Sequence, residues 1–239
     1  MEHSNETSNQ PQTALAGRTL QVNFSWIKWK ILITDKADKE AEPLYIMEYN
    51  CWKVSKPSFI FKKGGSQVVG TGNLHAVSIN ADCVVHGHPI TLTAMKRLET
   101  AYTHVSRVFK TADGANMTMT WASSCGFKNW DFVCLDDTQQ PVARFRADIW
   151  AVKKFALIEF LGEGDLTDIV RDEIVVTGTT LYMCMILRVN NPMQLVGAML
   201  HKPPKVVKSD SKNVQNGGGE NELDEWDAVT DSVTAKTNA

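Results

Sequence analysis

Residues 172–186 read DEIVVTGTTLYMCMI, and they lead into a run without charged side chains that extends from residue 174 to residue 187. The run has fourteen residues, whereas a helix that spans a membrane needs about 20 consecutive apolar ones. Three threonines and Gly178 interrupt the run, and the sequence RVNNP closes it. These features predict a buried internal element of a folded domain and not a membrane anchor.

The run is either a strand or a helix. Its β-branched residues favour a strand, but fourteen residues exceed the usual strand length of about five or six. A helix over the run is apolar on every face, and such a helix must be buried all round. We therefore expect a helix over residues 172–187, with Thr167 or Asp168 as its cap and with Asp172 and Glu173 near the positive end of its dipole.

The rest of the chain predicts a mostly β fold. The pairs Gly64-Gly65 and Asp113-Gly114 suit the positive φ angles of hairpin turns. Residues 94–109 have apolar side chains at helical spacing and predict one further helix. Many short strands with closely spaced turns are typical of an antiparallel sandwich or barrel, and a helix buried all round belongs inside a closed sheet. The runs that predict strands are LQVNFSWIKWKILI, LYIMEY, SFIF, ITLT, MTMTW, DFVCL, VARFRADIW and FALIEF.

The composition is typical of a soluble cytoplasmic protein. The chain has 239 residues, 43% of them hydrophobic and 22% charged, and its net charge of -2 gives no global field that favours nucleic acid. Its five cysteines are widely spaced and include no CxxC pair, which favours reduced thiols over disulfides or a zinc site. The polar N-terminal residues contain no secretory signal.

Three segments are expected along the chain. Residues 1–16 are a polar leader, residues 17–192 are the folded domain, and residues 193–239 are a flexible tail. The tail is rich in Pro, Lys, Ser, Asn and Gly, and it contains too little apolar surface to offset the entropy of ordering it.

Four stretches resemble a known superfamily. They are FSWIKWKILITD, KPSFIFKKGGSQVVGTG, TWASSCGFKNWDFVCLDDTQQPVARF and FALIEFLGEGDLTDIVRDEIVVTGTTLYM, and together they lie between Phe24 and Met183. They resemble the tubby C-terminal-like superfamily, which includes phospholipid scramblases and LURP-one-related proteins, and they are most similar to its small fungal members. The resemblance implies a mostly β (α+β) fold, in which a closed antiparallel β-barrel surrounds a central hydrophobic helix. Structural residues carry it, so it implies no catalytic activity.

No motif in the sequence predicts catalysis or a cofactor. The chain contains no Gly-x-Ser-x-Gly elbow and no P-loop. GTGNLH (residues 70–75) lacks the third glycine of a dinucleotide loop and predicts a turn between strands. His75, His86 and His88 are candidates for a metal site, but no Cys or carboxylate stands at a matching spacing, and exposed histidines are the simpler interpretation. We expect a non-enzymatic protein without a cofactor or a metal.

A lysine-rich stretch is the first candidate binding surface. No acid occurs between residues 49 and 81, and clustered lysines attract anionic headgroups by about 1 kcal/mol each. Tubby domains bind phosphoinositides through basic residues on the barrel surface, so the resemblance implies an adaptor that binds anionic membrane lipids. The alternative is that solvated lysines protect edge strands. The candidate residues are Lys28, Lys30, Lys53, Lys56, Lys62 and Lys63.

The acidic tail segment ENELDEWDAV is the second candidate. Trp226 has no core there in which to be buried, and an aromatic residue among acids is a common form of linear motif. The segment loosely resembles the tryptophan-acidic motifs that kinesin light chains bind. It is therefore either an acidic solubilising tail or a recruiting motif for a protein partner. The recruiting residues are then Leu223, Asp224, Glu225, Trp226 and Asp227. Neither candidate surface implies nucleic acid or a transmembrane span.

Overall fold

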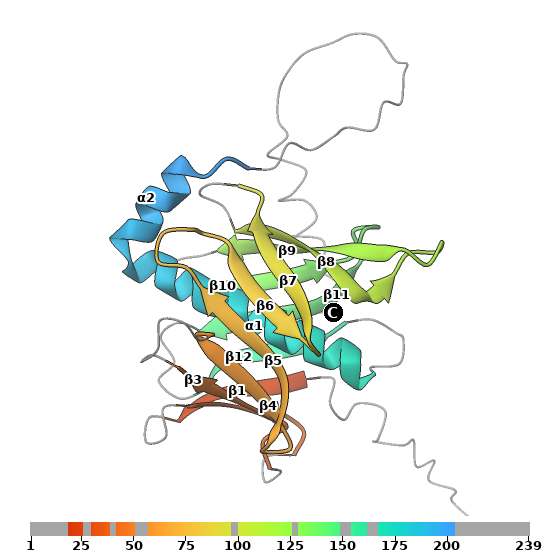
Figure 1. Cartoon of the computed structure of the whole chain (residues 1–239). Helices are drawn as coiled ribbons and strands as arrows, with labels where there is room; N and C mark the ends of the chain where they lie inside the picture. Colours follow the sequence, from red (N-terminus) through yellow and green to blue (C-terminus); the bar gives the residue numbers. More distant parts are fainter. Residues whose placement is uncertain are drawn as a thin grey trace, which may run out of the picture.

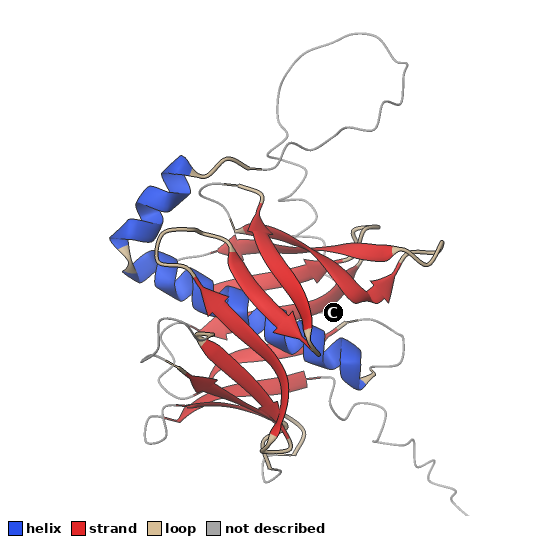
Figure 2. Cartoon of the chain, viewed as in Figure 1, coloured by secondary structure: helices blue, strands red, loops and turns tan. Residues whose placement is uncertain are grey.

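The computed structural model describes eight segments of the chain. Within them the protein is mostly β, with twelve strands and two helices (Figure 1, Figure 2). The segments are residues 19–25, 30–38, 42–50, 57–96, 100–125, 129–148, 154–161 and 167–203.

The twelve strands form one closed antiparallel barrel. Each strand pairs with the next one along the chain, and β1 closes the barrel by pairing with β12, where Leu20 lies opposite Ile158. The prediction of a closed antiparallel barrel is therefore confirmed. The strands are β1 (Thr19–Ser25), β2 (Lys30–Asp35), β3 (Tyr45–Tyr49), β4 (Phe59–Lys63), β5 (Gln67–Leu74), β6 (Ala81–Val85), β7 (His88–Ala94), β8 (Ala101–Lys110), β9 (Asn116–Cys125), β10 (Asn129–Leu135), β11 (Pro141–Asp148) and β12 (Lys154–Phe160).

The strands alternate between buried and partly exposed side chains, as one face of a sheet that covers a core requires. In β2, Ile31 and Ile33 are buried, whereas Lys30 and Leu32 are partly exposed. The hairpin turns occur at the glycines where the sequence predicts them. The glycines of the predicted Gly64-Gly65 and Asp113-Gly114 turns have positive φ angles, with values of 55°, 80° and 83°.

The helix predicted over residues 94–109 is wrong, because most of this segment is strand β8. Tyr102, His104 and Ser106 are buried, whereas Val105 between them is 55% exposed. The buried face of β8 thus carries two polar side chains and its outer face carries an apolar one. The alternation of apolar and polar residues that is typical of a strand is therefore absent from the sequence of β8. Its apolar residues match a helical spacing by coincidence.

The uncharged run is helical. Helix α1 spans Asp168–Asn190, and Thr167 caps it by accepting a hydrogen bond from the backbone N–H of Val170 at 3.4 Å. Every residue from 172 to 182 is buried, so three turns of the helix are covered on all faces. Within the described segments, no helix has the length and hydropathy that crossing a membrane requires.

Helix α1 contacts strands from several parts of the barrel. It packs against β5, β6 and β8, and in Figure 1 the strands β5 and β6 cross in front of it. On other strands, the ring of Tyr182 lies 6.0 Å from that of Trp130 in β10 and 5.3 Å from that of Phe145 in β11.

Glycines allow α1 to approach the strands this closely. A Cβ at Gly70 would lie 2.7 Å from the backbone oxygen of Val84 and 2.8 Å from Cγ2 of Val176. A Cβ at Gly178 would lie 3.0 Å from the ring of Trp121. The turn predicted for GTGNLH is therefore wrong, because these glycines belong to β5 and make room for the helix.

A second helix, α2, spans Pro192–Leu200 and occupies positions that the sequence assigns to a tail from residue 193 onward. Asn191 caps it, and proline in the first turn suits a helix start. Gln194 is fully buried and donates hydrogen bonds to two carbonyl oxygens of the loop between β5 and β6. The folded part of the chain therefore extends beyond residue 192.

Substitution of Gly70 tests the close approach of α1. Gly70→Ala should destabilise the fold by about 1–3 kcal/mol, because the new methyl group meets a backbone oxygen that cannot move without disturbing the sheet. Gly87 has a φ of 80° and nothing within 4 Å of a Cβ, so Gly87→Asn is the control, since Asn tolerates this conformation. Urea unfolding measures both changes. Equal unfolding midpoints for wild type and Gly70→Ala would contradict the prediction.

Candidate functional site

Two of the predicted lysines meet on the outer face of β2, β3 and β4. Nζ of Lys30 lies 2.6 Å from Oε1 of Glu48, and Nζ of Lys62 lies 2.7 Å from Oε2 of the same carboxylate. Hydrogen bonds from Lys30 and then from Lys62 hold the pKa of Glu48 below its ordinary value. Two cations therefore share one carboxylate, and Lys30 and Lys62 are called the lysine pair.

The lysine pair differs from other ion pairs of the sheet in its charge balance. Arg144 is paired with Asp131, and Arg146 with Glu159, so each base there has its own acid. The lysine pair instead carries one positive charge in excess of its acid. Because of this excess charge, the lysine pair can attract a further anion. Among the predicted lysines that the structure describes, it is the best candidate for an anion site.

The other predicted lysines do not join the pair. Lys63 follows Lys62 in β4 and therefore points to the opposite face of the strand, where its Nζ lies 3.0 Å from Oδ2 of Asp168. Lys28, Lys53 and Lys56 lie outside the described residues.

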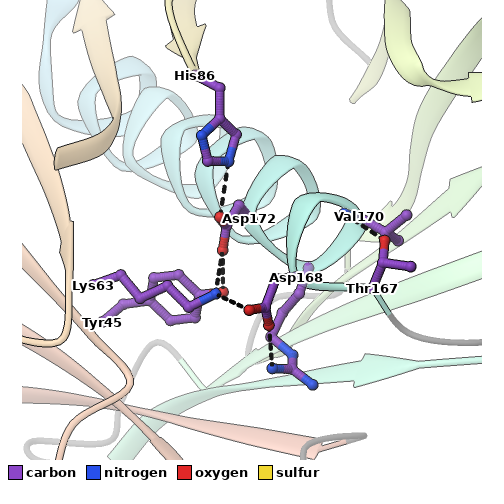
Figure 3. Close-up of polar contacts among 8 residues, drawn as sticks. Tyr45, Lys63, His86, Thr167, Asp168, Val170 and Asp172 are labelled. Carbon is purple, nitrogen blue, oxygen red and sulfur yellow. Dashed lines mark hydrogen bonds and ion pairs between the residues drawn. The ribbon is translucent and has the colours of Figure 1, made fainter. Parts of the chain in front are cut away.

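A second polar site surrounds Asp172, near the start of α1 (Figure 3). This side chain is 2% exposed, and its Oδ1 accepts a hydrogen bond from Oη of Tyr45 at 2.5 Å and lies 3.5 Å from Nζ of Lys63. Its Oδ2 lies 2.8 Å from Nε2 of His86. Burial, and then the bond to Asp172, raises the pKa of Tyr45 well above its ordinary value, so the hydroxyl remains a donor. These four residues are called the Asp172 cluster.

A two-residue hairpin turn positions His86. His86 and Gly87 have φ angles of 49° and 80°, as the tight turn between β6 and β7 requires, and the imidazole points at Asp172 (Figure 3). His75 has a different partner, because its Nε2 lies 2.8 Å from Oδ2 of Asp82. Among the residues that the structure describes, no group of three His, Cys, Asp or Glu side chains is placed to hold a metal ion.

The contacts of the Asp172 cluster join elements that are far apart in the sequence. A carboxylate and the imidazole that it orients are two of the three members of a hydrolytic triad. Within the described residues, however, His86 makes no hydrogen bond to a serine, threonine or cysteine that it might activate. The cluster instead ties α1 to β3, to β4 and to the turn between β6 and β7.

A third polar contact lies deeper, between α1 and β8. Glu173 and His104 are both almost fully buried, and Nε2 of His104 lies 3.6 Å from Oε1 of Glu173. This distance allows an ion pair but not a hydrogen bond. The contact explains why β8 turns a histidine inward, since a buried carboxylate needs a polar partner.

The three cysteine thiols that the structure describes have low reactivity. Cys83, Cys134 and Cys184 are free and buried. Burial raises the pKa of Cys83 to about 12 and that of Cys184 to about 11, and it raises that of Cys134 well above its ordinary value. Because the thiolate is the reactive form, these cysteines are poor nucleophiles and poor metal ligands at neutral pH.

The sequence pattern did not indicate the Asp172 cluster. Tyr45 belongs to an apolar run, His86 belongs to a turn, and their register against α1 depends on the closed sheet. One signal was present, because two acids stand directly at the start of an uncharged run. A charge at the edge of a buried helix needs partners from elsewhere in the fold.

The tail motif Leu223, Asp224, Glu225, Trp226 and Asp227 lies outside the described residues, so recruitment of a protein partner through it stays a prediction. Comparisons of this chain with protein-family models, with curated proteins and with solved structures found no match.

Removal of the Asp172 carboxylate should destabilise the fold by about 1–3 kcal/mol, because Asp172→Ala leaves the buried Tyr45 hydroxyl without its acceptor. Lys63 and His86 are partly exposed, so they rehydrate and add little to this cost. Asp168→Ala is the matched control, because this exposed carboxylate also meets Lys63 and its loss should cost under about 1 kcal/mol. Equal effects of the two substitutions in urea unfolding would contradict the special role of Asp172.

The buried thiols predict a loss of stability at alkaline pH. In the unfolded chain a thiol ionises above about pH 8.5, whereas in the folded chain the Cys184 thiol ionises only at about 11. The unfolded state therefore binds fewer protons in this window. The free energy of unfolding should fall by about 1.4 kcal/mol per pH unit for each thiol, starting near the ordinary pKa and ending near the raised one.

Unfolding in urea with a reductant present, at pH 8 and at pH 10, measures this loss. Cys184→Ala should reduce the difference between the two pH values, because one of the ionising groups is gone. A pH difference as large in Cys184→Ala as in the wild type would contradict the assignment.

Proposed function

We propose that this protein is a non-catalytic, tubby-like barrel, with α1 as its central helix, that binds anionic lipid headgroups at the cytoplasmic surface of a membrane through the lysine pair. The likeness of four stretches to the tubby superfamily supports the architecture, as do the contacts of α1 with β5, β6, β8, β10 and β11. The observation that carries the binding proposal is the convergence of Lys30 and Lys62 on one point of the outer sheet.

A headgroup phosphate is a suitable competitor for Glu48. The two ion pairs of this carboxylate are partly exposed, and exposed pairs contribute only about 0–1 kcal/mol each to stability. A phosphomonoester carries a charge of about -1.5 to -2 at neutral pH, which is more than the single charge of the carboxylate. The ammonium groups can therefore turn from Glu48 to a phosphate at little cost to the fold.

The neighbours of the lysine pair also suit a membrane surface. Leu32 and Ile46 lie opposite each other on β2 and β3, and Ile60 lies opposite Glu48 on β4. All three are partly exposed. Apolar side chains beside lysines favour contact with the interfacial layer of a bilayer, where hydrocarbon and headgroups meet.

Neutralisation of the two cations should weaken binding to vesicles that contain a phosphoinositide. Lys30→Gln combined with Lys62→Gln removes about 2 kcal/mol of attraction, or about thirtyfold in affinity. Glu48→Gln should act in the opposite direction and strengthen binding, because it releases both ammonium groups from their carboxylate. Vesicle flotation with the full chain measures both effects, and Lys110→Gln, at an exposed lysine of β8, is the control.

The opposite signs separate a binding role from a structural one. If the lysines only protect the sheet, Glu48→Gln leaves vesicle binding unchanged and affects unfolding alone. Unchanged binding in the double lysine variant would exclude the lysine pair as the headgroup site.

A further inference from the structure

Helix α2 has an inverted polarity. Its buried side carries Gln194, fully buried, and the small residues Gly197 and Ala198. Its outer side carries large apolar side chains. The exposed fractions of these are 56% for Met193, 48% for Val196, 59% for Met199 and 73% for Leu200. A helix that packs on its own domain normally turns its apolar stripe inward.

The packing of α2 explains why the apolar side chains cannot turn inward. A Cβ at Gly197 would lie 1.8 Å from the backbone oxygen of Val77, so no side chain fits at this position of the buried side. Gln194 donates to carbonyl oxygens of the same loop. The loop thus fixes the rotation of α2 and leaves its apolar side facing outward.

The exposed apolar side chains are concentrated at this corner of the molecule. Val189, at the end of α1, is 66% exposed, and Val77, against which α2 packs, is 45% exposed. Both belong to parts of the fold that contact α2, because α1 packs against α2 and Val77 lies against Gly197. By contrast, the other large exposed hydrophobic residues of the described segments are scattered singly over α1 and three strands, and they are Val68, Val84, Val105 and Ile169. A cluster of this kind marks an interaction site, whereas single exposed residues are ordinary.

The charge around α2 identifies the partner. No acid occurs between Glu173 and Asp210, and the exposed Lys202 follows α2 directly. Lys205 and Lys208 come next in the sequence. An apolar helix face with adjoining lysines and no acid is complementary to an anionic bilayer, whose surface attracts each lysine by about 1 kcal/mol.

We propose that α2 lies in the interfacial layer of an anionic lipid bilayer, with Met193, Val196, Met199 and Leu200 (the α2 face) inserted among the acyl chains and Lys202 at the headgroups. A helix of nine residues is about 13 Å long, so it lies along the membrane plane and does not cross it. This surface is separate from the lysine pair and does not depend on it. It requires negative charge at the membrane but no particular headgroup.

Flotation with two kinds of vesicle tests this. One kind contains phosphatidylcholine alone, and the other contains phosphatidylcholine with phosphatidylserine, without any phosphoinositide. The full chain should bind the second kind. Met199→Ser combined with Leu200→Ser should weaken this binding about a hundredfold, because two apolar side chains no longer enter the bilayer. Lys202→Gln should weaken it about fivefold.

Val68→Ser combined with Val105→Ser is the matched control, since these residues are 56% and 55% exposed on strands β5 and β8. This variant should bind like the wild type. Circular dichroism and urea unfolding should show the same fold in all variants, because every substituted side chain is solvent-exposed. Lys30→Gln combined with Lys62→Gln should weaken binding to the phosphatidylserine vesicles less than Met199→Ser with Leu200→Ser does, because phosphatidylserine offers the lysine pair no phosphomonoester.

Three results would overturn the inference. The first is wild-type binding by Met199→Ser with Leu200→Ser, and the second is failure of the wild type to bind phosphatidylserine vesicles. Neither of these affects the lysine pair, which the phosphoinositide vesicles test separately. The third is a wild-type chain that is dimeric without lipid and that becomes monomeric in the Met199→Ser with Leu200→Ser variant, because the α2 face is then an interface between two copies.

Discussion

The close approach of the strands to the uncharged run of α1, residues 174–187, is the constraint on which the rest of this structure depends. Three turns of α1 are buried on every side, so the strands must supply apolar contacts all round. Space is tight enough that Gly70 and Gly178 have no room for a side chain without displacing a neighbour. Trp121 fills the space opposite Gly178, so a small residue on the helix packs against a large one on the sheet. Any change in the register of α1 would replace these fits with clashes or cavities.

The same constraint decides where charges occur. Asp172 and Glu173 are adjacent in sequence and so point about 100° apart around the helix. Asp172 faces β3, β4 and the turn after β6, which supply Tyr45, Lys63 and His86, while Glu173 faces His104 of β8. The Asp172 carboxylate is thus hydrogen-bonded, whereas Glu173 and His104 meet at 3.6 Å without a hydrogen bond. An excess of positive charge is found on the outer surface, where Lys30 and Lys62 share one acid.

The sequence predicted those parts of the fold whose hydrophobic pattern agrees with their burial. The antiparallel β fold, the helical nature of the uncharged run and a cap at Thr167 or Asp168 were readable, because alternating runs, length and capping chemistry are local signals. The choice of a closed barrel over a sandwich came from the expected burial of this helix on all faces and from the resemblance of four stretches to a known superfamily. Strand β8 was not readable, since its inward residues His104 and Ser106 are polar. Strand β5 was not either, because its glycines serve the approach of α1 and resemble a turn. At the candidate site, Lys30 and Lys62 were predicted but Glu48 was not, because their meeting depends on the pairing of three strands.

The positions whose polarity differs from the expected one therefore say most about where this protein can bind other molecules. Lys62 and Lys63 are neighbours in one strand, yet alternation places the first on the outer face beside Glu48 and the second against Asp168 and Asp172 of α1. A count of lysines in the sequence treats them alike, whereas only Lys62 is available to an external anion without loss of a contact to α1. Helix α2 is the reverse case, with its amide buried and its apolar face outward. The attraction proposed for α2 combines apolar insertion with the charge of Lys202, so it should weaken in salt less than the attraction proposed for the lysine pair, which is screened over about 10 Å at 0.1 M ionic strength.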